Sequence, residues 1–141
     1  MKGGLKFLGL LGLVLAAGVR PAAAQGKQSL ILNAPFSFMV EQQKMPAGTY
    51  RIVVEHGWLQ IRGRSRQTVV AVLTLPVSGK TLEGAGQVVF DRYADRYFLS
   101  QVWLPGIETG RQALESREER ELKERQKLEA VVVKLQNQPG R

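Results

Sequence analysis

Short runs of alternating apolar and polar residues dominate the chain from Ser29 onward. A period of two places every second side chain on one face of a β-strand, as in the run that puts Phe36, Phe38 and Val40 together. The pattern therefore predicts a series of short antiparallel strands joined by turns. The segments with this character are 29–32, 36–40, 49–55, 58–61, 68–75, 87–93 and 96–104.

The turns between these runs carry residues that favour tight reversals. His56-Gly57 separates two runs rich in β-branched and aromatic residues, which predicts a two-residue hairpin. Ala94-Asp95 predicts a second tight turn. The polar segment 41–44 and the Pro46-Ala47-Gly48 segment predict further turns.

One run, Thr68 to Leu75, is apolar throughout rather than alternating. A continuous apolar run of this length predicts a strand that is buried on both faces. Proline lacks the backbone N–H that a sheet ladder uses, so Pro76 is expected to end this strand.

The composition changes near residue 116, where charged residues begin to dominate. Ser116 followed by Glu119 is the spacing of a capping box, and Arg117 with Glu121 is one of several opposite charges four residues apart. These features predict a solvated helix over about 116–128. The segment 130–136 can form a strand or continue the helix, and its consecutive valines favour the strand. The tail from Gln136 is expected to fray.

These elements predict a mainly β fold with about seven to eight strands and one C-terminal helix. Strands linked by short turns favour a small antiparallel sandwich or a partly open barrel.

The first 24 residues have the pattern of a secretory signal peptide. Lys2 and Lys6 precede an apolar stretch over 7–19, and Ala22 and Ala24 place small residues where a signal peptidase cleaves. We therefore expect cleavage after Ala24 and a single β-rich domain over 25–141. The alternative, an uncleaved anchor, fits poorly with the short glycine-containing apolar stretch. Export would place the domain in the periplasm or outside the cell.

The charge and the cysteine count limit the chemistry. The chain carries a net charge of +8, and removal of Lys2, Lys6 and Arg20 with the signal segment leaves +5. This balance favours an anionic envelope polymer or a protein partner, and export argues against nucleic acid. No cysteine is present, which excludes disulfides and thiol chemistry. No cofactor motif and no transmembrane span after cleavage are expected, and the oligomeric state stays open.

Three short motifs suggest a family resemblance. Pro35-Phe36-x-Phe38, Pro46-Ala47-Gly48-Thr49-Tyr50 and the segment from Asp95 to Trp103 occur together with the signal peptide and the late charged helix. In this combination the chain resembles a group of small exported bacterial proteins to which no activity is attached. The resemblance implies an exported β domain and carries over no functional residue.

The most pointed candidate for binding is a cluster of arginines. Arg62, Arg64 and Arg66 lie within five residues, and Arg51 lies on the preceding predicted strand. Guanidinium groups suit phosphate, sulfate and carboxylate groups. The alternative is a solvated hairpin tip that keeps a sheet edge from pairing with other chains.

The candidates for catalysis are weaker. His56 is the one histidine and falls in a predicted turn, where a solvent-facing role is expected. Asp91 and Asp95 each have an arginine beside them, Arg92 and Arg96, and we expect these to neutralise the aspartates rather than leave a metal site. No glutamate has the context of a carboxylate pair for glycoside hydrolysis.

These observations favour an exported, non-enzymatic binding or structural protein of the cell envelope that contacts anionic partners through its arginines. One alternative is a small-ligand carrier with an aromatic-lined barrel cavity, and another is a hydrolase. The aromatic candidates for such a cavity are Tyr50, Trp58, Tyr93, Tyr97, Phe98 and Trp103.

Overall fold

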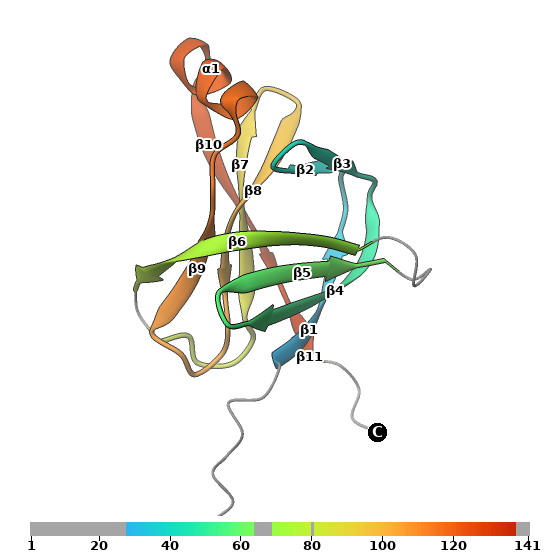
Figure 1. The fold of residues 1–141 in the computed structure, drawn as a ribbon, viewed down its shortest axis with the longest axis vertical. Coiled ribbons are helices and arrows are strands. Elements are labelled where there is room, and N and C mark those ends of the chain that lie inside the picture. Colours follow the sequence, from blue (N-terminus) through green and yellow to red (C-terminus); the bar gives the residue numbers. More distant parts are fainter. Residues whose placement is uncertain (1–27, 64–68, 80, 138–141) are drawn as a thin grey trace, which may run out of the picture.

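The computed structural model describes residues 28–63, 69–79 and 81–137, and these form eleven strands and one helix (Figure 1). The predicted class, mainly β with one C-terminal helix, is confirmed. The signal-peptide prediction falls on residues outside the described part. The elements are β1 (Gln28–Ala34), β2 (Phe38–Val40), β3 (Gln43–Met45), β4 (Gly48–Glu55), β5 (Trp58–Arg62), β6 (Val69–Ser78), β7 (Gln87–Tyr93), β8 (Arg96–Trp103), β9 (Thr109–Ala113), α1 (Arg117–Arg125), β10 (Leu128–Lys134) and β11 (Gln136–Asn137).

The strands form one open path in the order β10-β7-β8-β9-β6-β5-β4-β1-β11. A short hairpin of β2 and β3 lies off this path, with β2 parallel to β8 at Met39 and Phe98. Figure 1 shows β4, β5 and β6 running across the molecule in front of the upright strands β7, β8 and β10. This arrangement is that of a sandwich or open barrel whose corners are made by strands that change sheets.

β6 is one of these corner strands. Its first half, through Leu73, pairs with β5, and its second half, from Thr74, pairs with β9. The backbone N–H of Thr74 donates to Gly57 O, on the β5 side of β6. Because backbone groups two residues apart in a strand point to the same side, the nitrogen of Pro76 also faces the β5 side. β5 does not extend that far, so Pro76 costs no ladder bond and the prediction that it ends the strand is wrong.

The two faces of β6 differ in burial. Val70, Val72 and Thr74 point into the core and are buried, whereas Leu73 is 48% and Leu75 53% exposed. The prediction of burial on both faces is therefore wrong. The reason is that Leu73 and Leu75 point to the outer face of the sheet, away from the core, where their side chains stay largely exposed.

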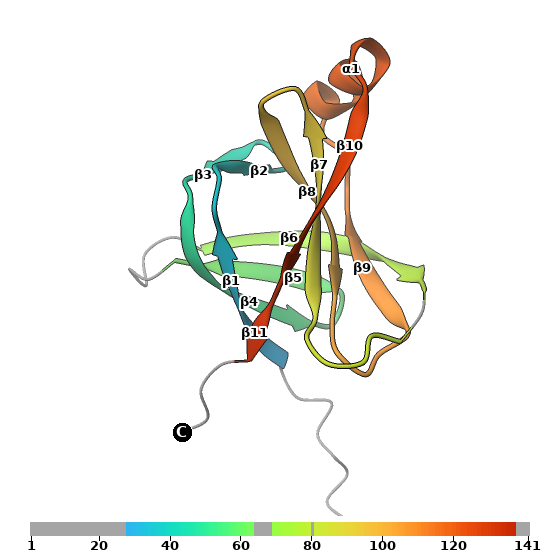
Figure 2. The same ribbon diagram turned by 180° about the vertical axis from the view of Figure 1, so that it is seen from behind.

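The second corner lies in the C-terminal strand. β10 and β11 are the two ends of the sheet path, and they are separated in the chain by Leu135 alone. Leu135 is 2% exposed and its N–H donates to Gly86 O over 2.8 Å. Figure 2 shows the segment crossing the molecule from β10 to β11. The chain itself thus bridges the opening of the sheet, and Gln136 and Asn137 pair with β1 rather than fray.

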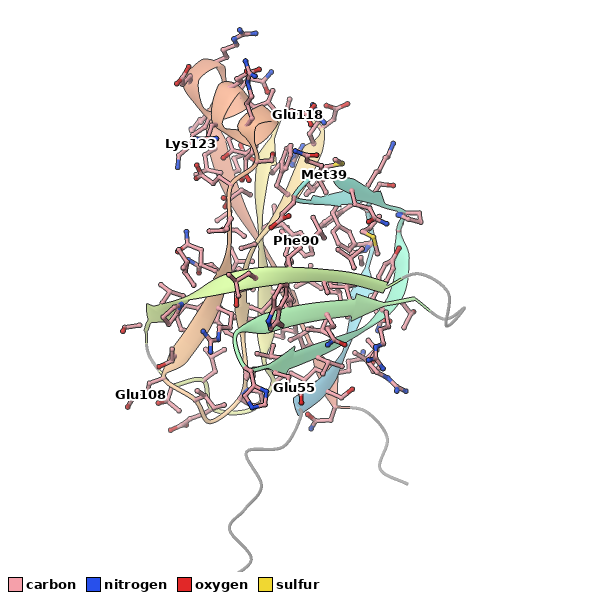
Figure 3. The ribbon with its side chains drawn as sticks, in the orientation of Figure 1. Met39, Glu55, Phe90, Glu108, Glu118 and Lys123 are labelled. Carbon is pink, nitrogen blue, oxygen red and sulfur yellow. The ribbon has the colours of Figure 1, made fainter. Side chains whose placement is uncertain are left out.

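The core fills the space between the crossing strands. Phe90, labelled in Figure 3, lies near its centre with no exposed surface. Its ring meets those of Phe36 and Phe38 edge-on, with centroids 5.0 and 5.2 Å away. Phe36 also stacks on Tyr97. These contacts tie the short β2 segment and the chain before it to the β7–β8 hairpin.

The helix is shorter than the predicted 116–128. Ser116 accepts a hydrogen bond from Glu119 N, which confirms the predicted N-cap, and the helix ends before Gln126. The segment that follows is the strand β10, along β7. None of the described residues forms a helix long and apolar enough to span a membrane.

Three two-residue turns use a backbone with positive φ. His56 and Gly57 both have it, as the hairpin predicted for them requires, and the turn at Ala94 and Asp95 is also found. The turn predicted in the polar segment 41–44 is found at Glu41 and Gln42, whereas Gln43 and Lys44 lie within β3.

Candidate functional site

Arg51 and Arg62 lie directly opposite each other on β4 and β5. Both side chains are exposed on the outer face of the sheet, the face away from Ile52 and Ile61 in the core. Opposed residues of an antiparallel pair have Cβ atoms about 5 Å apart, and like charges at that distance repel. The structure thus brings together two of the four arginines that the sequence singled out.

The repulsion between these arginines is not offset inside the described part of the chain. No described carboxylate forms an ion pair with Arg51 or Arg62, and Arg62 Nη2 donates to Gln60 Oε1 over 2.8 Å. Arg64 and Arg66 fall outside the described residues. Two neighbouring guanidiniums without a carboxylate partner form a site at which an external anion would bind with a favourable free energy.

The same face becomes apolar away from the arginines. Trp58, on β5, is 47% exposed and lies opposite Leu73 on β6. Leu75 follows on β6 with 53% of its surface exposed. The outer face of β4, β5 and β6 therefore has a basic end at Arg51 and Arg62 and, at its other end, an apolar group beside Glu55, which lies opposite Trp58. We call it the β4–β6 face. The sequence missed the apolar end because the run 68–75 predicted burial on both sides.

His56 lies at the tip of the β4–β5 hairpin. Its side chain is 87% exposed, and its Nδ1 atom lies 3.8 Å from Glu55 Oε1. This is the solvent-facing position that the sequence predicts. No nucleophile is placed against it in the described residues.

The arginines beside the two aspartates have other partners than expected. Arg96 Nη1 forms an ion pair with Glu118 on the helix over 2.5 Å, and Arg92 lies 3.8 Å from Glu129 on β10. The prediction that they neutralise Asp91 and Asp95 is wrong. The physical reason is that successive residues of a strand point to opposite faces, so Arg92 points away from Asp91 and lies beside Glu129 instead.

Asp91 instead forms a buried polar cluster with Glu119, which sequence reasoning missed. The two carboxyl groups lie close enough to share a hydrogen bond whenever one of them is protonated. The hydroxyl of Tyr93 lies 3.5 Å from Glu119 Oε1. A β-bulge in β8 frees Ser100 from the ladder, and its side chain hydrogen-bonds to Asp91. In the sequence, the spacing of Asp91 and Tyr93 indicates only that both side chains lie on the same face of β7.

The environment of this cluster shifts its protonation. Burial, with the nearby charges of Asp91 and Glu115, raises the pKa of Glu119 to about 7. Burial also raises the pKa of Asp91, and burial with the charge of Glu119 raises that of Tyr93. At the rim, Lys123 donates to Glu115 over 2.8 Å; Figure 3 labels Lys123 on the helix.

The geometry of the cluster fits a structural contact that attaches the helix to β7 better than it fits catalysis. Glycoside hydrolysis needs two carboxyl groups at least about 5 Å apart with room for a sugar between them, which hydrogen-bonded groups do not leave. No set of three or more ligating side chains that could hold a metal ion occurs among the described residues.

Most of the aromatic candidates are packed in the protein. Tyr50, Tyr93 and Phe98 are buried, whereas Trp58 is largely exposed. Trp103 packs against glycines on the β9 side of the sheet. Two openings of about 650 and 360 Å³ lie elsewhere, and neither is lined by an aromatic side chain. Neither of these two openings therefore gathers the aromatic candidates.

No family model matches the chain, and neither a curated protein nor a solved structure matches it.

Proposed function

We propose that this chain is an exported, non-enzymatic binding protein of the cell envelope that attaches to an anionic polymer through the β4–β6 face. The carrying observation is the cross-strand pair Arg51 and Arg62, which is exposed and unpaired within the described residues. Export rests on the signal-peptide pattern of residues 1–24 and on the resemblance to small exported bacterial proteins.

Electrostatics support an anionic partner. A phosphate, sulfate or carboxylate group between two guanidiniums removes their mutual repulsion and adds charge-assisted hydrogen bonds. The sequence carries two more arginines, Arg64 and Arg66, in the segment that joins β5 to β6. The net charge of +5 that remains after removal of Lys2, Lys6 and Arg20 acts in the same direction at longer range.

The apolar end of the face supports a second kind of contact. Trp58 and Leu73 form an exposed cross-strand pair on the same surface as the arginines. A partner that carries both anionic groups and apolar surface buries more area here than a simple polyanion. Trp58 also provides a spectroscopic reporter, because its environment changes when the face is covered.

The test uses dextran sulfate as a soluble polyanion and follows Trp58 fluorescence in the Trp103→Phe variant, which keeps Trp58 as its one tryptophan. We expect saturable binding that weakens with added salt, as phosphate- or sulfate-driven binding does. The double charge reversal Arg51→Glu with Arg62→Glu should lower the affinity at least tenfold. The matched control, Arg120→Glu with Lys127→Glu, changes the net charge equally at two exposed positions, one within the helix and one just after it, and should have a much smaller effect.

Equal losses in the two double variants would show that net charge alone drives binding, and would refute the assignment to the β4–β6 face. Export is tested separately. Protein recovered from its own host should begin at Gln25 and lie outside the cytoplasm, and an intact N-terminus on cytoplasmic protein would contradict it.

A further inference from the structure

A groove separates the β2–β3 hairpin from β6. Figures 1 and 2 both show the hairpin above the end of β6 that follows the β5–β6 connection. The opening has a volume of about 650 Å³, within the range of ligand pockets. It is lined by Val40, Glu41, Gln42, Gln43, Lys44, Val70, Ala71 and Val72.

The wall on the β6 side is an unpaired strand edge. β6 pairs with β9 only from Thr74 onward, and no described strand pairs with that side of the first half of β6. Because the Thr74 N–H points to the β5 side, the strand alternation turns the N–H and C=O of Ala71 the other way. Those peptide groups of Ala71 therefore face the groove.

The wall on the hairpin side is also an unpaired edge. β3 pairs with β2 alone among the described strands. In a two-residue hairpin the residues that flank the loop, here Val40 and Gln43, exchange both backbone hydrogen bonds. The N–H and C=O of the next residue, Lys44, then point away from β2 and toward the groove.

The two walls are the ends of an interrupted sheet. One part runs through β7, β8, β2 and β3, and the other runs through β6 and β5. β3 is antiparallel to β6, because β2 and β6 both run parallel to β8. One additional strand in the groove would be parallel to one wall and antiparallel to the other, and would make the sheet continuous.

The side chains around the groove define what such a strand should carry. On the inner side, Val40, Val70 and Val72 are buried and form an apolar floor. Two charged residues line the groove, Glu41 in the hairpin turn and the exposed Lys44 on the outer side of β3, and neither forms an ion pair with any described residue. Because side chains of a strand alternate between faces, the occupant should alternate apolar with acidic residues.

We propose that the groove between β3 and β6 binds an extended segment of a partner polypeptide by strand addition, with apolar side chains inward and acidic side chains beside Lys44. Main-chain hydrogen bonds to Ala71 and Lys44 hold the segment, and the alternation gives the specificity. This site is separate from the arginines of the β4–β6 face, and it does not depend on the function proposed for them.

The test uses a capped heptapeptide of alternating valine and aspartate and follows backbone NMR signals of the purified protein. We expect saturable binding in the micromolar range, with the largest shifts at residues 43–45 and 70–73. A peptide of the same composition with its valines consecutive should bind at least tenfold more weakly, because its apolar side chains cannot all face the floor.

Variants of the two walls test the hydrogen bonds and the charge. Ala71→Pro removes the groove-facing donor without removing a bond to β5, and should lower the affinity at least fivefold, whereas Ala71→Ser keeps the donor and should bind normally. Lys44→Glu should weaken the aspartate peptide about two- to fivefold and strengthen a peptide with lysine in its place. The charge reversals of Arg51 and Arg62 should leave peptide affinity unchanged.

If Ala71→Pro fails to fold, peptides N-methylated at alternate amides replace it, because methylation removes the donors to one wall. We expect each methylated peptide to bind at least fivefold more weakly. Equal binding of methylated and unmethylated peptides, shifts confined to the β10 edge, or no saturable binding would each overturn the proposal.

Discussion

Glu119 is the residue whose protonation links the helix to the sheet. Its ordinary pKa of 4.5 rises to about 7 in the fold, so the folded state holds the proton more tightly than the unfolded chain. The stabilisation is fully present below about pH 4.5 and is lost as the pH rises through 7. The shift corresponds to roughly 3 kcal/mol in the free energy of unfolding.

Replacing Glu119 by glutamine tests this linkage. We expect Glu119→Gln to be as stable as the native protein at pH 5 and more stable at pH 8, because a neutral amide still donates to Asp91 without a charge to bury. Urea denaturation between pH 5 and 8 measures the slope. The exposed control Glu124→Gln should keep the native slope, and a full native slope in Glu119→Gln would contradict the assignment.

Trp103 is held by two residues that lack a side chain. A Cβ atom at Gly110 would lie 2.7 Å from the indole Cδ2, and one at Gly79 would lie 2.3 Å from Cη2. Neither glycine needs positive φ, so the requirement is one of space alone. The indole N–H donates to Gln101 Oε1 over 3.0 Å, which fixes the ring over the glycines.

We expect Gly110→Ala to lower the free energy of unfolding by about 1–3 kcal/mol, the usual cost of overpacking. Thermal or urea denaturation measures it. The same substitution in a Trp103→Leu background should cost less, because a smaller side chain leaves room for the methyl group. Equal costs in the two backgrounds would show that the strand, not the ring, resists the change.

At the scale of elements, two strands belong to both parts of the sheet, and each turns at a particular residue. β6 changes partner between Leu73 and Thr74, and the C-terminal strand changes at Leu135. Leu135 is nearly fully buried where the two ends of the sheet meet, whereas Leu75 is exposed on the outer face. The two leucines therefore offer a matched comparison of the same substitution.

Leu135→Ala should lower the free energy of unfolding by about 2–5 kcal/mol, and Leu75→Ala by less than about 0.5 kcal/mol. Chemical denaturation of both variants checks the difference. Similar costs would mean that the corner at Leu135 contributes little to joining the sheet ends.

Elements with strong local signals were predicted and those made by tertiary pairing were not. The turn at His56-Gly57 was found because its residues suit positive φ. β9, in contrast, has low strand propensity and forms because Gly110 fits under Trp103 while the strand pairs with β6. β11 was likewise missed, since only its pairing with β1 makes it a strand.

The candidate site, like the fold, was predictable from the sequence only in its local features. Neighbouring arginines are visible in the sequence, but their position opposite each other depends on the register set by the turn at His56-Gly57. The exposure of Leu73 and the pairing of Asp91 with Glu119 depend on which elements cover which face. A single sequence does not specify that, because burial is a property of the assembled sheet.

At the scale of the whole molecule, the shared strands should make the sheet unfold as one unit. Trp58 lies on β5 and Trp103 on β8, so each reports a different part of the sheet. The variants Trp58→Phe and Trp103→Phe, each with one remaining tryptophan, should give coincident urea midpoints after correction for their stability. Separate transitions in one protein would show that the two parts unfold independently.

The joining of the sheet ends at Leu135 also sets when the fold can be completed during synthesis. Leu30 pairs with Asn137, so the first described strand waits for a segment more than a hundred residues later in the chain. Asn137 must leave the exit tunnel of the ribosome before that pairing can form. Until then β1 has only β4 beside it, and its other edge stays unpaired.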